Sequence, residues 1–157
     1  RAAGLHDRLC IPGIAPLLGS GKTDQGHFYY AVPVAGQKLY RALGRKGGEP
    51  AFHLVLRLCG DGAAIFAALG AAEVALPDAR LDRFDLEGDS RLSLVDLQGA
   101  EPRDADKASK EHLELARGFF RAVLERSRYR SADSRLLRVI DRAGSLAELR
   151  RMAYLTL

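Results

Sequence analysis

Residues 17–30 read LLGSGKTDQGHFYY, and the GSGKT within them is the first group of residues that could do chemistry. A phosphate-binding P-loop has the pattern G-x-x-x-x-G-K-[ST], whose first glycine makes the tight turn that points backbone N–H groups at phosphate. Pro16 occupies that first position, and proline has no N–H and a fixed φ. The residues after GKT are strand-like, whereas a P-loop lysine opens a helix. We therefore predict an exposed hairpin turn with one solvated lysine, Lys22.

The elements around this turn are expected to be strands followed by a short helix. Residues 11–18 are apolar and interrupted by two prolines, and residues 27–34 are rich in aromatic and branched side chains. The polar segment SGKTDQG lies between them, which predicts a β-hairpin. Residues 38–43 predict a short helix, and a loop over residues 44–50 with two adjacent glycines follows.

The spacing of apolar residues changes in the middle of the chain, from that of a helix to that of short strands. Apolar residues recur at helical spacing from 51 to 69, which predicts a helix whose middle is weakened by Gly60 and Gly62. Two short runs of mixed apolar and charged residues, 81–87 and 91–97, flank Gly-Asp-Ser and predict a second hairpin.

The chain after Pro102 is expected to be helical to its end. A first helix has a broad apolar face, formed by Leu113, Leu115, Phe119, Phe120, Val123 and Leu124. Two shorter helices are expected around Gly144, with Ser145 as the N-cap of the second.

Length and composition predict one folded domain over residues 1–157. The 157 residues are 47% hydrophobic and 28% charged, and their net charge of +4 permits an anionic partner without requiring one. Cys10 and Cys59 have no metal-type spacing, which favours a reducing, cytoplasmic compartment. We expect no transmembrane segment, because we find no apolar run of roughly 20 residues.

Two segments resemble protein-kinase-like proteins in the same order. Residues 10–43, CIPGIAPLLGSGKTDQGHFYYAVPVAGQKLYRAL, resemble the strand pair, hinge and short helix of that fold. The resemblance assigns residues 28–32 to the strand before the hinge, 33–36 to the hinge and 39–43 to the start of the helical lobe. It also implies that Val32 contacts the nucleotide. Residues 65–102, IFAALGAAEVALPDARLDRFDLEGDSRLSLVDLQGAEP, resemble the kinase segment from the helix before the catalytic loop to the metal-binding aspartate.

The resemblance implies a role for three further side chains. Asp78 matches the catalytic-loop aspartate that accepts the proton of the substrate hydroxyl, and Arg80 matches a nearby cation that can steady the transferring phosphate. Asp96 falls where the kinase aspartate binds the magnesium ion of the nucleotide. The sequence LVDLQGAEP most resembles bacterial lipopolysaccharide core (Kdo/heptose) kinases and related small-molecule phosphotransferases, because Gln98 replaces the glycine of ordinary Ser/Thr kinases.

Several kinase parts are replaced or absent in this sequence. Arg83 stands where the second magnesium ligand should be, and Asp82, one residue earlier, is expected to point to the opposite face of a strand. Leu76 replaces the histidine expected two residues before Asp78. No glycine-rich strand pair and no strand lysine precede the hairpin, so the N-terminal lobe is expected to be reduced, missing or supplied by another chain.

The remaining polar residues predict no second site. The histidines at 6, 27, 53 and 112 lack ligand spacing and are expected to be surface or satisfied side chains. Arg117, Arg121 and Arg128 follow one side of a helix with Glu125 among them, which favours a solvated face over a nucleic-acid or lipid site. Tyr29 and Tyr30 are expected to pack half-buried in their strand.

The expected fold is α+β and kinase-like: mostly the helical C-terminal lobe, over residues 49–157, with a hairpin, hinge and short helix over residues 1–48. The expected function is that of a degenerate, catalytically impaired kinase-like protein that binds a protein partner without a cofactor. One alternative is a phosphotransferase that uses ATP and Mg²⁺ on a lipopolysaccharide core sugar or a similar hydroxyl. The other alternative is an anion- or nucleic-acid-binding module, for which nucleic acid is the less favoured ligand.

Overall fold

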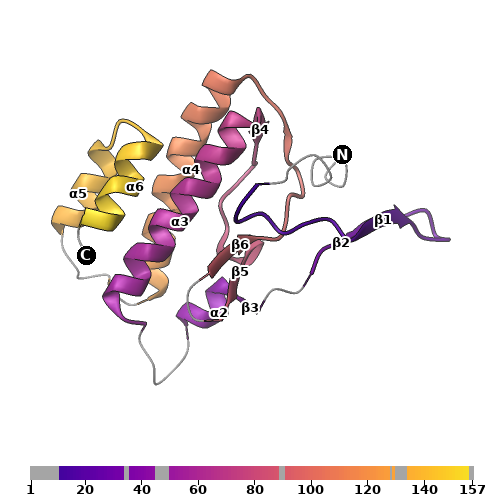
Figure 1. Cartoon of the computed structure of the whole chain (residues 1–157), viewed down its shortest axis with the longest axis horizontal. Helices are drawn as coiled ribbons and strands as arrows, with labels where there is room; N and C mark the ends of the chain where they lie inside the picture. The colour runs from indigo at the N-terminus through magenta and orange to yellow at the C-terminus, as the bar shows by residue number, and fades with distance from the viewer. Residues whose placement is uncertain are drawn as a thin grey trace.

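The fold is α+β, with a group of long helices beside small antiparallel sheets (Figure 1). The computed structural model describes residues 11–33, 36–44, 50–88, 91–127, 129 and 134–155. The elements in chain order are β1 (Gly19–Lys22), β2 (Phe28–Ala31), β3 (Gln37–Lys38), α2 (Leu39–Leu43), α3 (Phe52–Ala71), β4 (Val74–Ala75), the 3₁₀ turn η1 (Leu81–Arg83), β5 (Phe84–Glu87), β6 (Arg91–Leu94), β7 (Glu101–Pro102), α4 (Ala105–Arg126), α5 (Ser134–Arg142) and α6 (Leu146–Leu155).

The helix α3 is the centre of the hydrophobic core and packs against both α4 and α6. Phe66 of α3 makes edge-to-face contact with Phe119 of α4, at 5.9 Å between ring centroids. The glycines expected to weaken α3 are buried, and a Cβ on Gly62 would lie 2.5 Å from the Phe119 ring. Gly62 therefore allows α4 to approach closely, and α3 continues through it.

The length and composition of α3 would also allow it to cross a membrane. Its most apolar window has a mean hydropathy of 1.6, and 61% of that window is buried within the fold. The helix is therefore more apolar than expected from the sequence, in which no apolar run of roughly 20 residues was recognised. Its burial against α4 and α6 is that of the core helix of a folded domain.

The C-terminal helices follow the prediction, including the cap of α6. Asp104 caps α4 by accepting from the backbone N–H groups of Asp106 and Lys107. Ser145 Oγ accepts from the Glu148 N–H at 3.1 Å, and the Glu148 carboxylate accepts from the Gly144 N–H. This reciprocal pair explains why α6 begins after Gly144.

The arginines of α4 form a solvated face only in part. Arg121 is 52% exposed, as expected, and pairs at the surface with the Asp141 carboxylate. Arg117 is only 18% exposed and donates to the Ala143 carbonyl at 2.6 Å, so it ties α4 to the end of α5, which corrects the prediction for this residue. Arg128 lies outside the described residues.

The first hairpin is confirmed, but its strands are shifted along the chain. β1 pairs antiparallel with β2, with Gly21 opposite Tyr29, so the segment predicted as a turn supplies one strand. The turn is closed by Thr23 and Gly26, whose positive φ of 84° suits glycine. Lys22 is exposed on a strand and opens no helix, as expected for a segment that is not a P-loop.

Residues 11–18 do not form the predicted strand within the part of the chain that the structure describes. They contain one isolated bridge, Ile14 to Leu94, and a turn in which the Ile14 N–H donates to the Ile11 carbonyl. Pro12 and Pro16 supply no N–H for a strand ladder, which explains the irregular path. The segment still anchors the hairpin to β6, because the Ala15 N–H donates to the Leu94 carbonyl at 2.9 Å.

Two small sheets hold the loops that carry the predicted site residues. β5 lies between β3 and β6 in an antiparallel sheet, and the second predicted hairpin is β5 with β6. The residues at 89 and 90 of its turn lie outside the described part. β4 pairs with β7, which holds the two ends of the segment from 74 to 102 together.

Candidate functional site

Asp78 and Asp96 lie in loops that the sheets bring to one place. Asp78 follows β4, and Asp96 is the second residue after β6. The Val95 N–H donates to the Arg83 carbonyl at 2.9 Å, so the loop after β6 is bonded directly to η1. The two aspartates that the kinase resemblance singled out therefore meet at a shared neighbour, Arg83.

The Arg83 guanidinium occupies the space between the two aspartates. Its Nε and Nη2 donate to Asp78 Oδ1 and Oδ2 at 2.6 and 3.1 Å, which is a bidentate ion pair. Its Nη1 donates to the carbonyls of Asp96 and Gln98 at 3.2 and 2.9 Å and lies 3.5 Å from Asp96 Oδ2. The Arg83 side chain is only 4% exposed. A buried cation with four hydrogen bonds thus lies where the resemblance predicted a metal ligand.

The remaining oxygen of Asp96 is also occupied. Asp96 Oδ1 accepts from the Tyr30 hydroxyl at 2.5 Å and from the Gln98 N–H at 2.7 Å. Tyr30 belongs to β2, so this bond ties the first hairpin to the cluster. The sequence predicted Tyr30 only as a packed strand residue, because the partner of its hydrogen bond is 66 residues away.

The pKa values of the cluster reflect these bonds. The hydrogen bond from Arg83 lowers the pKa of Asp78, against a smaller opposing effect of burial. Burial and the hydrogen bond to Asp96 raise the pKa of Tyr30 to about 12. At neutral pH, Asp78 is therefore an ionised acceptor and Tyr30 a protonated donor, and a carboxylate held this way by an arginine is a weak base.

The carboxylate oxygens of Asp78 and Asp96 do not fit the magnesium ion of the kinase family. Mg²⁺ needs near-octahedral oxygen ligands with free lone pairs directed at it. Both Asp78 oxygens point at Arg83, and Asp96 Oδ1 already accepts two hydrogen bonds. Within the described ranges, no group of three His, Cys, Asp or Glu side chains could hold a metal ion.

Arg80 and Asp82 lie at the edge of the cluster. Arg80 is 61% exposed, and its Nε is 3.5 Å from both Asp78 Oδ1 and Asp82 Oδ1. Asp82 was expected to point away because of its place in a strand, but Leu81–Arg83 is a 3₁₀ turn. Asp82 is exposed and Arg83 points inward, as expected. The geometry of the 3₁₀ turn, and not the alternation of a strand, separates the two side chains.

His112 supports the loop that carries Asp78. It comes from α4, is fully buried, and its Nε2 accepts from the backbone N–H of Leu76 at 3.4 Å. Its Nδ1 is buried without a hydrogen-bond partner, and burial lowers the pKa of His112 to about 4. The expectation of a surface or satisfied histidine holds for His27 and His53, which are exposed, but is wrong for His112; His6 lies outside the described residues.

Val32 lines a cavity of about 500 Å³ beside the cluster. Val95, the residue before Asp96, forms part of the same wall, so the cavity and the cluster are neighbours. The other lining residues are Pro33, Gly36, Gln37, Lys38, Arg41 and Asp85. The segment predicted as a hinge therefore borders a space large enough for a small molecule, although its residues 34 and 35 lie outside the described part.

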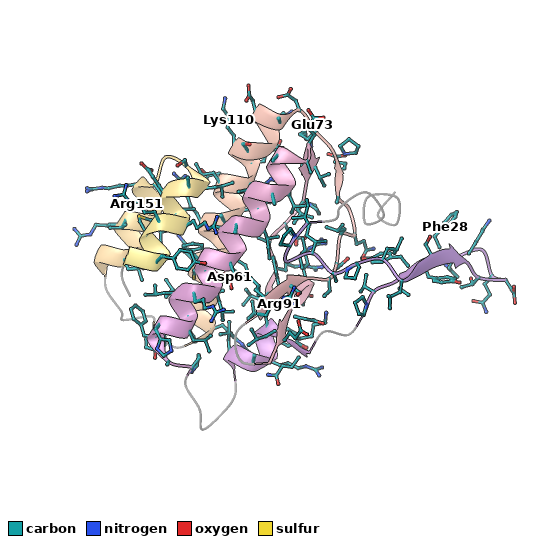
Figure 2. The ribbon with its side chains drawn as sticks, in the orientation of Figure 1. Phe28, Asp61, Glu73, Arg91, Lys110 and Arg151 are labelled. Atoms are coloured by element: carbon teal, nitrogen blue, oxygen red, sulfur yellow. The ribbon has the colours of Figure 1, made fainter. Side chains whose placement is uncertain are left out.

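Figure 2 shows Phe28 on the hairpin that projects from the rest of the fold. Phe28 is 85% exposed, and Tyr29, the next residue of β2, and Leu18, at the base of the hairpin, are also exposed. These three side chains are most of the large exposed hydrophobics in the described part of the chain.

A scan against protein-family models and a search of curated proteins both gave no match to this chain.

Proposed function

We propose that this protein is a degenerate kinase-like protein that does not transfer phosphate and acts by binding a partner. One observation carries the proposal: the Arg83 guanidinium is bonded to both oxygens of Asp78 and lies against the Asp96 carboxylate. Phosphoryl transfer needs a base that can accept a proton and a metal that neutralises phosphate charge. A buried arginine opposes both requirements.

The free-energy cost of moving Arg83 indicates that its side chain stays between the two aspartates and does not swing out to admit a metal ion. Its side chain is almost fully buried and donates to two carbonyls as well as to Asp78. Removing a hydrogen-bonded charge from such a site leaves its partners unpaired, which costs several kcal/mol on the order of a broken buried ion pair.

The projecting hairpin supports the binding part of the proposal. Apolar side chains on a two-stranded hairpin lack a core to pack against, and exposed apolar patches of this kind are typical of interaction surfaces. Leu18, Phe28 and Tyr29 are the exposed large apolar side chains of this hairpin, and the consecutive strand residues Phe28 and Tyr29 point to opposite faces, so the hairpin exposes apolar surface on both sides. A protein partner that covers it is the occupant we favour.

A phosphotransferase acting on a sugar hydroxyl remains the second candidate. The specific observation in its favour is that Asp78 and Asp96 meet beside a cavity lined by Val32. The basic helix gives no comparable support to an anion- or nucleic-acid-binding module, because Arg117 and Arg121 are engaged within the fold.

The test is calorimetric titration of ATP into the chain with and without Mg²⁺, together with an assay of ATP turnover. We expect no magnesium-dependent heat and no turnover above that of Asp96→Ala. Magnesium-dependent binding and turnover that are both lost in Asp96→Ala would establish the phosphotransferase instead. Asp24→Ala, in the exposed hairpin turn, is the matched control for removing a carboxylate.

A further inference from the structure

The cavity beside the cluster combines an apolar wall with a charged rim. Val32, Pro33 and Val95 provide the apolar part. Gly36 allows the chain to pass close to β5, because a Cβ there would lie 2.1 Å from the Leu86 carbonyl oxygen. The apolar part of this lining can exclude water from an apolar group of a ligand.

The charged rim is built on the β3–β5 ladder and on α2. Lys38 pairs with Asp85 in the strand register, and its Nζ lies 2.8 Å from Asp85 Oδ1. The Asp85 side chain is 5% exposed and that of Lys38 39%, so the carboxylate is buried beneath the ammonium. Lys38 is thus fixed at the rim by a buried partner.

Asp85 is already paired within the fold. Its buried Oδ1 lies 2.8 Å from the Lys38 ammonium, so the two charges neutralise each other. An anionic ligand in the cavity therefore meets no unpaired carboxylate, and it needs a cation other than Lys38 to pair with.

Arg41 adds a second cation at the rim, three residues after Lys38. Its Nε donates to the neighbouring Tyr40 hydroxyl at 2.9 Å, in an exposed setting. The lining side chains Lys38, Arg41 and Asp85 together carry a net charge of +1. This charge matches a ligand with one negative group, and it would not neutralise a polyphosphate.

We propose that this cavity binds a small organic carboxylate without a metal. The apolar body of the ligand packs on Val32 and Val95, and its carboxylate pairs with Arg41 at the rim. This inference goes beyond the proposed function and does not depend on it, because it requires neither Asp78 nor Asp96.

Naphthoate and its uncharged analogue naphthamide are matched probes for this site, since they have nearly the same shape and differ in charge. Binding is followed by the backbone amide chemical shifts of the full chain in NMR spectra. We expect naphthoate to shift the amides of Gly36, Gln37 and Val95 in a saturable way. Naphthamide is expected to bind about tenfold more weakly, the scale of one well-placed ion pair.

Three variants test the origin of this preference. Arg41→Gln lowers the rim charge and should weaken naphthoate binding about twofold to fivefold, with little effect on naphthamide. Asp85→Asn raises the rim charge and should strengthen naphthoate binding. Arg151→Gln is the control for charge, since Arg151 is exposed on α6, on the other side of the helices from the hairpin (Figure 2).

The NMR spectra also report whether each variant is folded, and Arg41→Gln tests the proposal even where Asp85→Asn unfolds. Equal affinity for the two probes would overturn the proposal. So would shifts confined to the hairpin around Phe28, or the absence of saturable shifts at the cavity amides.

Discussion

At the scale of single residues, the main finding is that Arg83 acts as an internal cation. It forms a bidentate ion pair with Asp78 and lies 3.5 Å from a carboxylate oxygen of Asp96. These are the carboxylates that the kinase resemblance assigned to catalysis and to metal binding. The sequence predicted that a cation stood at the position of a metal ligand. It did not predict that both aspartates would be bound by it.

Removing the Arg83 guanidinium should destabilise the protein. Arg83→Ala leaves two carboxylates next to each other without their cation, and we expect a loss of about 2–3 kcal/mol in the free energy of unfolding. The partial exposure of the two aspartates keeps the loss below that of a fully buried pair. Arg83→Lys keeps the charge but cannot pair bidentately, so its stability should lie between those of Arg83→Ala and the unsubstituted protein. Urea denaturation measures the stability of all three proteins. Equal stability of Arg83→Ala and the unsubstituted protein would contradict the structural role of Arg83.

His112 should make the stability depend on pH between about 6.5 and 4. Burial lowers the pKa of His112 from 6.5 to about 4 in the folded protein, so the unfolded chain binds a proton more readily across this range. The stabilising effect of the neutral ring is therefore complete above pH 6.5 and is lost as the pH falls towards 4, for a total of about 3 kcal/mol.

The matched variant is His112→Gln, which can still accept the Leu76 N–H but does not titrate. Urea unfolding at several pH values should give a flatter dependence in this range than the unsubstituted protein. The same slope in both proteins would show that His112 is not the titrating group.

At the scale of elements, the close approach of α3 and α4 depends on a missing side chain. Gly62→Ala would place a Cβ 2.5 Å from the Phe119 ring, and we expect the overpacking to cost about 1–3 kcal/mol. Gly118→Ala is the control, since a Cβ there meets nothing within 4 Å and alanine favours the helix by about 0.5–1 kcal/mol. Thermal unfolding should therefore shift in opposite directions for the two variants, and shifts of the same sign would refute the packing.

The hydrogen bond between Tyr30 and Asp96 should hold the first hairpin on the domain. Tyr30→Phe removes this bond, so we expect faster amide hydrogen exchange in residues 19–31. The free energy of unfolding should fall by about 2 kcal/mol at most. Tyr29→Phe is the control, because Tyr29 is the neighbouring exposed residue of the same strand.

Burial of Tyr30 and its bond to Asp96 together predict an alkaline transition. They raise the pKa of Tyr30 from 10 to about 12, so its stabilising effect is complete below pH 10 and is lost as the pH rises to 12. In a tyrosinate absorbance titration, the component lost in Tyr30→Phe should therefore titrate near pH 12. Loss of a component that titrates near pH 10 would contradict the burial of Tyr30 against Asp96.

At the scale of the whole molecule, local patterns predicted more of the fold than of the site. Helical periodicity predicted α3 and α4, and the Ser145 cap predicted the start of α6, because these signals lie within a few residues of one another. The position of β1 was missed, because glycines and a lysine read as a turn, although pairing with β2 makes them a strand. The site depends on Tyr30, Arg83 and Asp96, which meet only through the arrangement of the hairpin and the sheets, and no local pattern encodes such a contact.

The central claim is that Arg83 replaces a metal ion between Asp78 and Asp96. The most direct measurement is calorimetric titration of Mg²⁺ into the unsubstituted protein and into Arg83→Asn, which exchanges the cation for an amide oxygen that can bind a metal. We expect no binding heat in the unsubstituted protein and measurable binding in folded Arg83→Asn that is abolished by adding Asp96→Ala. Magnesium binding in the unsubstituted protein that requires Asp96, or none in folded Arg83→Asn, would contradict the account.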